Sequence, residues 1–235
     1  MYGLGPIRTP PHSRVTLSPL PDCQQVSTTM TRALKADQPT RGHGALEAYL
    51  ARRRAQKANQ LIPTQQRRGR LLDVGCGSYP YFLATTQFAE KWGIDQAFDA
   101  ESTLELDDGR VALIPFDVQR DVSLPFATDF FSVVTMLAVF EHIEPAKLKF
   151  LLGEVHRVLR PGGTFVMTTP SSWTDWLLKL MAGVGLVSRA EIEEHKDTYT
   201  QREIRSTIEG AGFDPGNVIS GSFEIGVNLW AKATK

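Results

Sequence analysis

The stretch that decides the fold is LLDVGCGS, residues 71–78. Residues 70–74 form a short apolar run that is typical of a buried strand, and a turn with Gly75 and Gly77 follows it. Glycine gives the backbone access to unusual angles and lets a ligand approach closely. In a doubly wound α/β sheet, the first such turn lies near the switch in strand order, where ligands bind. The stretch therefore predicts a ligand site at the end of this strand.

The residues around the two glycines distinguish between cofactors. A dinucleotide-binding G-x-G-x-x-G/A motif requires a small residue at the position of Pro80. Asp73, two residues before Gly75, is a poor neighbour for a pyrophosphate, but its carboxylate suits the ammonium and the sulfonium of S-adenosylmethionine. The turn therefore favours S-adenosylmethionine over NAD.

Acidic residues also stand at the ends of the next two predicted strands, residues 91–96 and 111–116. Asp95 can accept hydrogen bonds from both ribose hydroxyls. Asp117 can accept from the exocyclic amine of adenine, which leaves the Val118 amide for a ring nitrogen. Each acid alone is as readily explained as a helix cap or a turn residue. With Asp73 they form a coherent nucleoside site.

Short apolar runs and helical patterns alternate along the rest of the chain, which predicts a parallel sheet with right-handed crossovers. A Pro-Gly-Gly turn is expected at residues 161–163, and the last two strands should pair antiparallel because their connection is short. The predicted fold is α/β, with a Rossmann-like seven-stranded, mostly parallel sheet, helices on both faces and an antiparallel C-terminal strand. The further strands are expected at 132–137, 164–169, 218–225 and 227–233, and the helices at 145–159 and 201–210.

Two domain boundaries follow from composition. Residues 1–43 are rich in Pro, Thr, Ser and Gln and predict a flexible leader, and the domain is expected to occupy residues 44–235. Its N-terminal helix is expected at 45–61, before Pro63, and an insert at 171–200. Residues 1–70 hold twelve Lys and Arg against three Asp and Glu, so a basic segment precedes an acidic domain.

Five segments of the chain resemble, in order, the signature blocks of class I S-adenosylmethionine-dependent methyltransferases: LLDVGCGS, GIDQ, FDVQ, VVTMLAVFEHI and LRPGGTFVMTTP. The similarity is strongest to the type 11 group, which includes ubiquinone and menaquinone C-methyltransferases. It covers residues 68–170 densely, and YTQREIRSTIEGAGF looks like the usual C-terminal helix before the last hairpin. The resemblance implies a Rossmann-like fold and S-adenosylmethionine as cofactor, and it does not specify the acceptor.

The resemblance also implies roles for particular residues. Asp73 and the Gly75 and Gly77 backbones would face the methionine end, Asp95 the ribose, and Asp117 and Val118 the adenine. Leu137 and Ala138 would lie beneath the cofactor, and the neighbouring Cys76 and Gln96 are placed in the same cofactor-binding set. Two positions depart from the family pattern: Tyr79 stands where a further glycine is common, and Ser132 replaces a usual acid.

Glu141-His142 raises the question of a metal site. Related ubiquinone O-methyltransferases and small-RNA terminal methyltransferases bind a divalent metal with E-x-x-E-H, but Ala138 occupies the position of the first acid here, so no metal is predicted. His142 is a candidate general base, or it packs beside the cofactor while Glu141 begins a helix favourably for its dipole. His195, in the insert, is a second candidate base or acceptor contact, or a loop-packing histidine.

The insert carries an apolar stripe at helical spacing: Trp173, Trp176, Leu177, Leu180 and Met181. It is either a lid packed on the sheet edge or a wall for an acceptor with apolar surface; contact with a membrane surface is a weaker alternative. The arginines at 52–54, 67, 68 and 70 could follow phosphates, but a solvated helix face is favoured. Nucleic acid is therefore not the favoured partner.

The expected function is methyl transfer from S-adenosylmethionine to a small-molecule, lipid- or glycan-linked acceptor. The alternatives are an RNA or protein methyltransferase that uses the basic N-terminal segment, and a non-catalytic S-adenosylmethionine-binding protein. Two cysteines and the absence of a stretch long enough to span a bilayer favour a cytoplasmic location. The oligomeric state cannot be read from the sequence.

Overall fold

The computed structural model describes residues 45–99, 101–106, 109–121, 123–171 and 199–235. The predicted leader and residues 172–198 of the predicted insert, with His195 and the apolar stripe, lie outside these ranges. None of the described helices is both long and apolar enough to cross a membrane.

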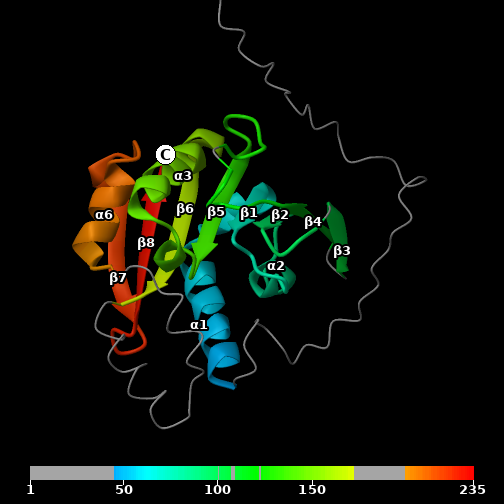
Figure 1. The fold of residues 1–235 in the computed structure, drawn as a ribbon, viewed down its shortest axis with the longest axis horizontal. Helices are drawn as coiled ribbons and strands as arrows, with labels where there is room; N and C mark the ends of the chain where they lie inside the picture. The colour runs from blue at the N-terminus through cyan, green and yellow to red at the C-terminus, as the bar shows by residue number, and fades with distance from the viewer. Residues whose placement is uncertain (1–44, 100, 107–108, 122, 172–198) are drawn as a thin grey trace, which may run out of the picture.

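A single mixed sheet forms the centre of the described fold (Figure 1). Five strands are parallel, and β3, β8 and β7 are added antiparallel at the two sides, with β7 on β8. The mostly parallel α/β prediction is confirmed. In spatial order the strands are β3 (Ser102–Leu106), β4 (Gly109–Pro115), β2 (Glu90–Asp95), β1 (Arg70–Val74), β5 (Phe131–Leu137), β6 (Leu159–Pro170), β8 (Asn228–Thr234) and β7 (Val218–Phe223).

Two details of the predicted sheet were wrong. The sheet has eight strands rather than seven, because β3 adds to the edge through a hairpin with β4. The Pro-Gly-Gly segment is not a turn between elements but lies inside β6, where Gly162 has φ 73° and donates its amide to the Lys235 carbonyl. The register of β6 against β5 shifts at this segment, and hydrogen bonds between Gly162, Gly163 and Lys235 hold it to the C-terminus.

The strand order places a ligand-binding edge at β1 and β5. The chain runs from β1 outward through β2 and β4, then returns to the other side of β1 to form β5 and β6. The strand order therefore reverses between β1 and β5, and ligands of open α/β sheets bind outside the carboxyl ends of the strands at such a switch. In Figure 1 the arrows of β5 and β6 point to this edge, and the N-terminal part of α1 extends past it.

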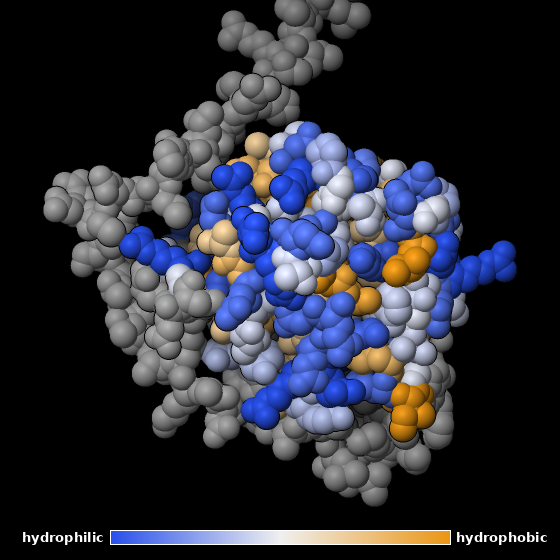
Figure 2. Space-filling model, turned by 180° about the vertical axis from the view of Figure 1, so that it is seen from behind, coloured by the Kyte–Doolittle hydropathy of each residue, from blue (hydrophilic) through white to orange (hydrophobic). Residues whose placement is uncertain are grey.

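Helices cover both faces of the sheet. Alternate residues of a strand point to opposite faces, so Leu71 packs with α1 (Ala45–Leu61) and α2 (Tyr81–Thr85), while Leu72 packs with α3 (Pro145–Val158) and α6 (Gln201–Glu209). Seen from behind, the described surface is mostly polar, with apolar residues in small separate groups (Figure 2).

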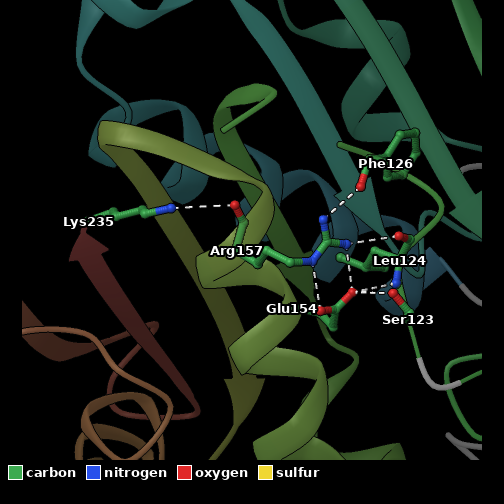
Figure 3. Close-up of polar contacts among 6 residues, drawn as sticks. All are labelled: Ser123, Leu124, Phe126, Glu154, Arg157 and Lys235. Carbon is green, nitrogen blue, oxygen red and sulfur yellow. Dashed lines mark hydrogen bonds and ion pairs between the residues drawn. The ribbon is translucent and has the colours of Figure 1, made fainter. Parts of the chain in front are cut away.

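A charged cluster fixes the opposite edge of the sheet, at the start of β5. Arg157 donates to Glu154 and to the carbonyls of Leu124 and Phe126, and Glu154 also accepts from the Ser123 hydroxyl (Figure 3). Burial alone would raise the pKa of Glu154, but the hydrogen bonds from Arg157 and Ser123 outweigh it and lower that pKa. This acid is therefore fully used in holding a loop, far from the ligand-binding edge.

Candidate cofactor site

The glycine turn after β1 is folded tightly over the ends of its neighbours. Gly75 has φ 72° and Gly77 φ 74°, a region that residues with a Cβ seldom adopt. A Cβ on Gly75 would lie 2.5 Å from Val139 Cγ2, which follows β5. The Gly75 amide donates to the Ile94 carbonyl of β2 at 2.8 Å. Glycine at position 75 is thus required both by its backbone angle and by the close approach of β5.

Asp95 joins this turn to the end of β2. Its Oδ2 accepts a hydrogen bond from the Gly77 amide at 2.8 Å, and its Oδ1 accepts one from the Ala97 amide at 2.8 Å. The structure therefore shows the turn role that the sequence left open for this acid. Each oxygen of an ionised carboxylate can accept more than one hydrogen bond.

Asp73 is buried beneath the turn. Thr135, opposite it on β5, donates its hydroxyl to Asp73 Oδ1 at 2.6 Å. Burial raises the pKa of Asp73 to about 7; the Thr135 hydrogen bond opposes this shift, and the charge of Asp95 adds to it. A cation placed beside Asp73 would favour its ionised form, so this carboxyl group is suited to a positively charged ligand.

Cys76 contributes packing and backbone rather than a reactive thiol. Its Sγ packs against Gly93 of β2. A side chain at position 93 would place its Cβ only 2.7 Å from this sulfur. Burial and the charges of Asp73 and Asp95 raise the pKa of the thiol well above its usual value, so it stays protonated. The neighbouring Gln96 side chain is exposed.

Asp117 also shapes a turn, at the end of β4. Its Oδ1 accepts from the Gln119 amide at 2.8 Å, and its Oδ2 lies 3.3 Å from Arg120 Nε. Val118 is partly buried against the core. The Phe116 amide donates to the Asp95 carbonyl at 3.1 Å, so the acids after β2 and β4 are held at one edge.

The end of β5 carries backbone strain. Ala138 has φ 58°, which is uncommon for a residue with a Cβ, and its amide donates to the Thr168 carbonyl of β6 at 2.9 Å. Such strained residues cluster at functional sites, where the surrounding structure holds them. Leu137 and Ala138 are partly buried, beside the glycine turn on which Val139 packs.

The pair Glu141-His142 is divided by the structure. Both belong to the short helix η2 (Phe140–His142), with Glu141 in its first turn, and α3 begins only at Pro145. Glu141 points to β6, where its Oε2 accepts from the Thr169 hydroxyl at 2.9 Å. His142 is partly buried, and its carbonyl accepts from the Gln119 side chain. Glu141 was assigned no binding or catalytic role from the sequence. An acidic residue next to apolar residues that are expected in the core indicates a buried carboxylate, and this signal was available.

Within the described ranges, no three His, Cys, Asp or Glu side chains are grouped closely enough to hold a metal ion. The acids at the carboxyl edge accept hydrogen bonds from amides and a hydroxyl.

Comparison with known proteins decides the family, since residues 46–216 match the model of a methyltransferase domain. The chain belongs to this methyltransferase family. S-adenosylmethionine is the cofactor of the domain, and the buried acid and the glycine turn at the switch point fit its charge and shape.

One relative is similar in sequence, and solved structures are similar in fold. An uncharacterized methyltransferase of Synechocystis sp. (strain ATCC 27184 / PCC 6803 / Kazusa) is 38% identical over 56 residues, which span 23% of this chain and 26% of the relative. A SAM-dependent methyltransferase structure from Archaeoglobus fulgidus has a TM-score of 0.58 at 16% identity, over 82% of this chain and 95% of that one. A possible exported protein from Bordetella parapertussis has a TM-score of 0.59 at 16% identity, over 84% and 75%.

Proposed function

We propose that the protein transfers a methyl group from S-adenosylmethionine to a small-molecule, lipid- or glycan-linked acceptor. The observation that carries this proposal is the convergence of Asp73, Asp95 and Asp117 with the glycine turn at the carboxyl edge of β1, β2 and β4.

In the proposed arrangement, the methionine end lies at Asp73 and the turn of Gly75, Cys76 and Gly77. Asp95, which also holds the turn through the Gly77 and Ala97 amides, accepts from the ribose hydroxyls, and the exposed Gln96 contributes only its backbone. Asp117 and Val118 are placed at the adenine, and Leu137 and Ala138 lie beneath the cofactor. The raised pKa of Asp73 supports the first of these placements, because a cationic group there would stabilise its ionised form.

The chemistry asks little of the protein beyond positioning. The bound cofactor supplies an activated methyl group on a sulfonium, which is a good leaving group. The rigid turns at Asp95 and Asp117 hold their carboxylates in place before any ligand arrives. Orientation of two reactants in a closed site accounts for a large part of the rate enhancement in such reactions.

The acceptor is proposed to bind beside the end of β6. The two ends of the predicted insert meet there, since Ser171 and Tyr199 form an isolated bridge. Tyr199 packs edge-on against Phe140 of η2, with ring centroids 5.9 Å apart. The Ser171 amide donates to the Val227 carbonyl at 2.9 Å. This anchoring supports an acceptor-side role for the insert, and His142 and His195 remain proposed contacts or bases.

The alternative of an RNA or protein acceptor bound by basic residues receives less support. Arg53 pairs with Glu224 at 3.2 Å, and Lys57 lies 4.8 Å from the centre of the Trp230 ring. Arg67 donates to Asn59, and Arg70 pairs with Glu90 at 3.3 Å. These cations are used to pack α1 and β1 against the domain. The low cysteine content supports the cytoplasm as the proposed compartment.

The test is to incubate the full chain with methyl-labelled S-adenosylmethionine and fractionated cell extract, and to identify the labelled product by mass spectrometry. A labelled small molecule, lipid or glycan is expected, with equal yield in the presence of a metal chelator. Trp176→Ala and His195→Ala should lower turnover while cofactor affinity stays within about 0.5 kcal/mol. Label in RNA or protein would favour the alternative acceptor, and cofactor binding with no labelled product would indicate a non-catalytic binding protein.

A further inference from the structure

Glu141 is a buried acid with little to hold it. Glu141 is only 3% exposed to solvent, and the Thr169 hydroxyl donates to its Oε2 at 2.9 Å. Across the described ranges, no second donor is found for this carboxylate. An ionised carboxylate removed from water normally requires several donors, because its desolvation is costly.

Comparison with Glu154 shows how a purely structural acid is held in the same molecule. Glu154 accepts from Arg157, from the Ser123 hydroxyl and from the Leu124 amide (Figure 3). It is paired with a cation and lies at the opposite edge of the sheet. Glu141 has neither a cation nor an amide, so its lone pairs are left for a donor that the described fold does not supply.

The position of Glu141 connects it to the reaction. Val139, two residues earlier, packs on Gly75 of the cofactor turn, and the Ala138 amide is bonded to the Thr168 carbonyl. Thr169, which follows Thr168 in β6, donates a hydrogen bond to the Glu141 carboxylate. Glu141 therefore lies between the ends of β5 and β6, beside the proposed position of the cofactor and on the side where the acceptor is proposed to bind.

We propose that Glu141 contacts the acceptor directly, that the acceptor presents an O–H or N–H group, and that Glu141 takes its proton. This inference rests on the proposed function. The acceptor oxygen or nitrogen forms a bond to the methyl carbon, and the carbon–sulfur bond breaks with its electron pair remaining on sulfur. The acceptor proton passes to the Glu141 carboxylate and then to solvent. Thr169 is the positioning residue that orients the carboxylate.

The first test measures binding and does not depend on turnover. The probe 4-fluorobenzylamine offers an apolar ring and an N–H donor, and fluorine NMR can follow its binding to the full chain saturated with S-adenosylhomocysteine. Glu141→Gln should weaken this binding at least tenfold, while the exposed neighbour variant Glu144→Gln should not change it. The binding of 4-fluorotoluene, which lacks the donor, should be the same in all three proteins. Absence of amine binding to the wild type, or equal binding to Glu141→Gln, would overturn the proposal.

The second test uses the acceptor that the labelling experiment identifies. Glu141→Gln should lower kcat roughly a hundredfold, the scale of general base catalysis, and should also raise KM, because the same carboxylate contacts the acceptor. Thr169→Val should reduce kcat partially, because Thr169 donates to the Glu141 carboxylate. The role of Glu141 would be overturned if kcat were unchanged in Glu141→Gln, or if His142→Gln lowered kcat a hundredfold and Glu141→Gln did not. The proposed function would fail differently, through a wild type that labels no acceptor.

Discussion

The Oδ2 atom of Asp95 accepts a hydrogen bond from the Gly77 amide at 2.8 Å, and this bond joins the acid after β2 to the glycine turn after β1. The residue expected to bind the ribose therefore also holds the turn expected to bind the methionine end. Cofactor affinity and the local structure of the turn should respond together when Asp95 is changed.

Replacing Asp95 by Ala should weaken the binding of S-adenosylhomocysteine by about 1.5–3 kcal/mol, the range for hydrogen bonds to a charged group. Isothermal titration calorimetry gives the affinity, and thermal unfolding gives the accompanying loss of stability. Asp214→Ala is the matched control, because Asp214 Oδ1 holds the Gly216 amide of a remote turn at 2.7 Å. An affinity unchanged in a folded Asp95→Ala protein would place the ribose elsewhere.

Cofactor affinity should rise with pH up to about 7. Burial raises the pKa of Asp73 to about 7, so the carboxyl group is mostly protonated at pH 6 and mostly ionised at pH 8. Because only the ionised form attracts the cationic end of S-adenosylmethionine, affinity should increase by up to about tenfold per pH unit below the pKa. Calorimetry at pH 6 and 8 measures this, and Asp73→Asn should be insensitive to pH. Equal wild-type affinities at both pH values would show that Asp73 does not contact the cationic end of the cofactor.

The same group has an unusual effect on stability. The pKa of Asp73 is about 3.9 in the unfolded chain and about 7 in the folded protein, so between these values the folded state binds more protons. The Asp73 contribution to the free energy of unfolding therefore falls as pH rises from about 4 to 7. Urea titrations should show that Asp73→Asn gains stability relative to the wild type across this window. A difference that is constant with pH would contradict the raised pKa.

Two glycine-to-alanine substitutions should change the stability of the protein in opposite directions. Gly75→Ala should destabilise the protein by roughly 2–4 kcal/mol, since φ is 72° and the new Cβ would overlap Val139. Gly153→Ala, in α3, meets no atom within 4 Å and should stabilise by about 0.5–1 kcal/mol. Denaturant unfolding measures both, and Val139→Ala should recover part of the Gly75→Ala loss. A neutral Gly75→Ala would show that the turn can move away from β5.

The sequence predicted the elements whose signals are local. Residues 70–74 and the acids at 95 and 117 lie where expected, because an apolar run closed by glycine or an acid marks a buried strand and its end. The edge strand β3 was missed because STLEL is short, although Asp108-Gly109 is typical of a tight hairpin. The isolation of Glu141 could not be predicted, because it depends on Thr169 of a strand reached only after α3.

The central claim, that the carboxyl edge of β1, β2 and β4 binds S-adenosylmethionine, is tested most directly by calorimetry with three ligands. S-adenosylmethionine and S-adenosylhomocysteine should each bind to the full chain in the micromolar range, and NAD should give no binding signal. Micromolar binding of NAD with no response to either adenosyl ligand would contradict the account.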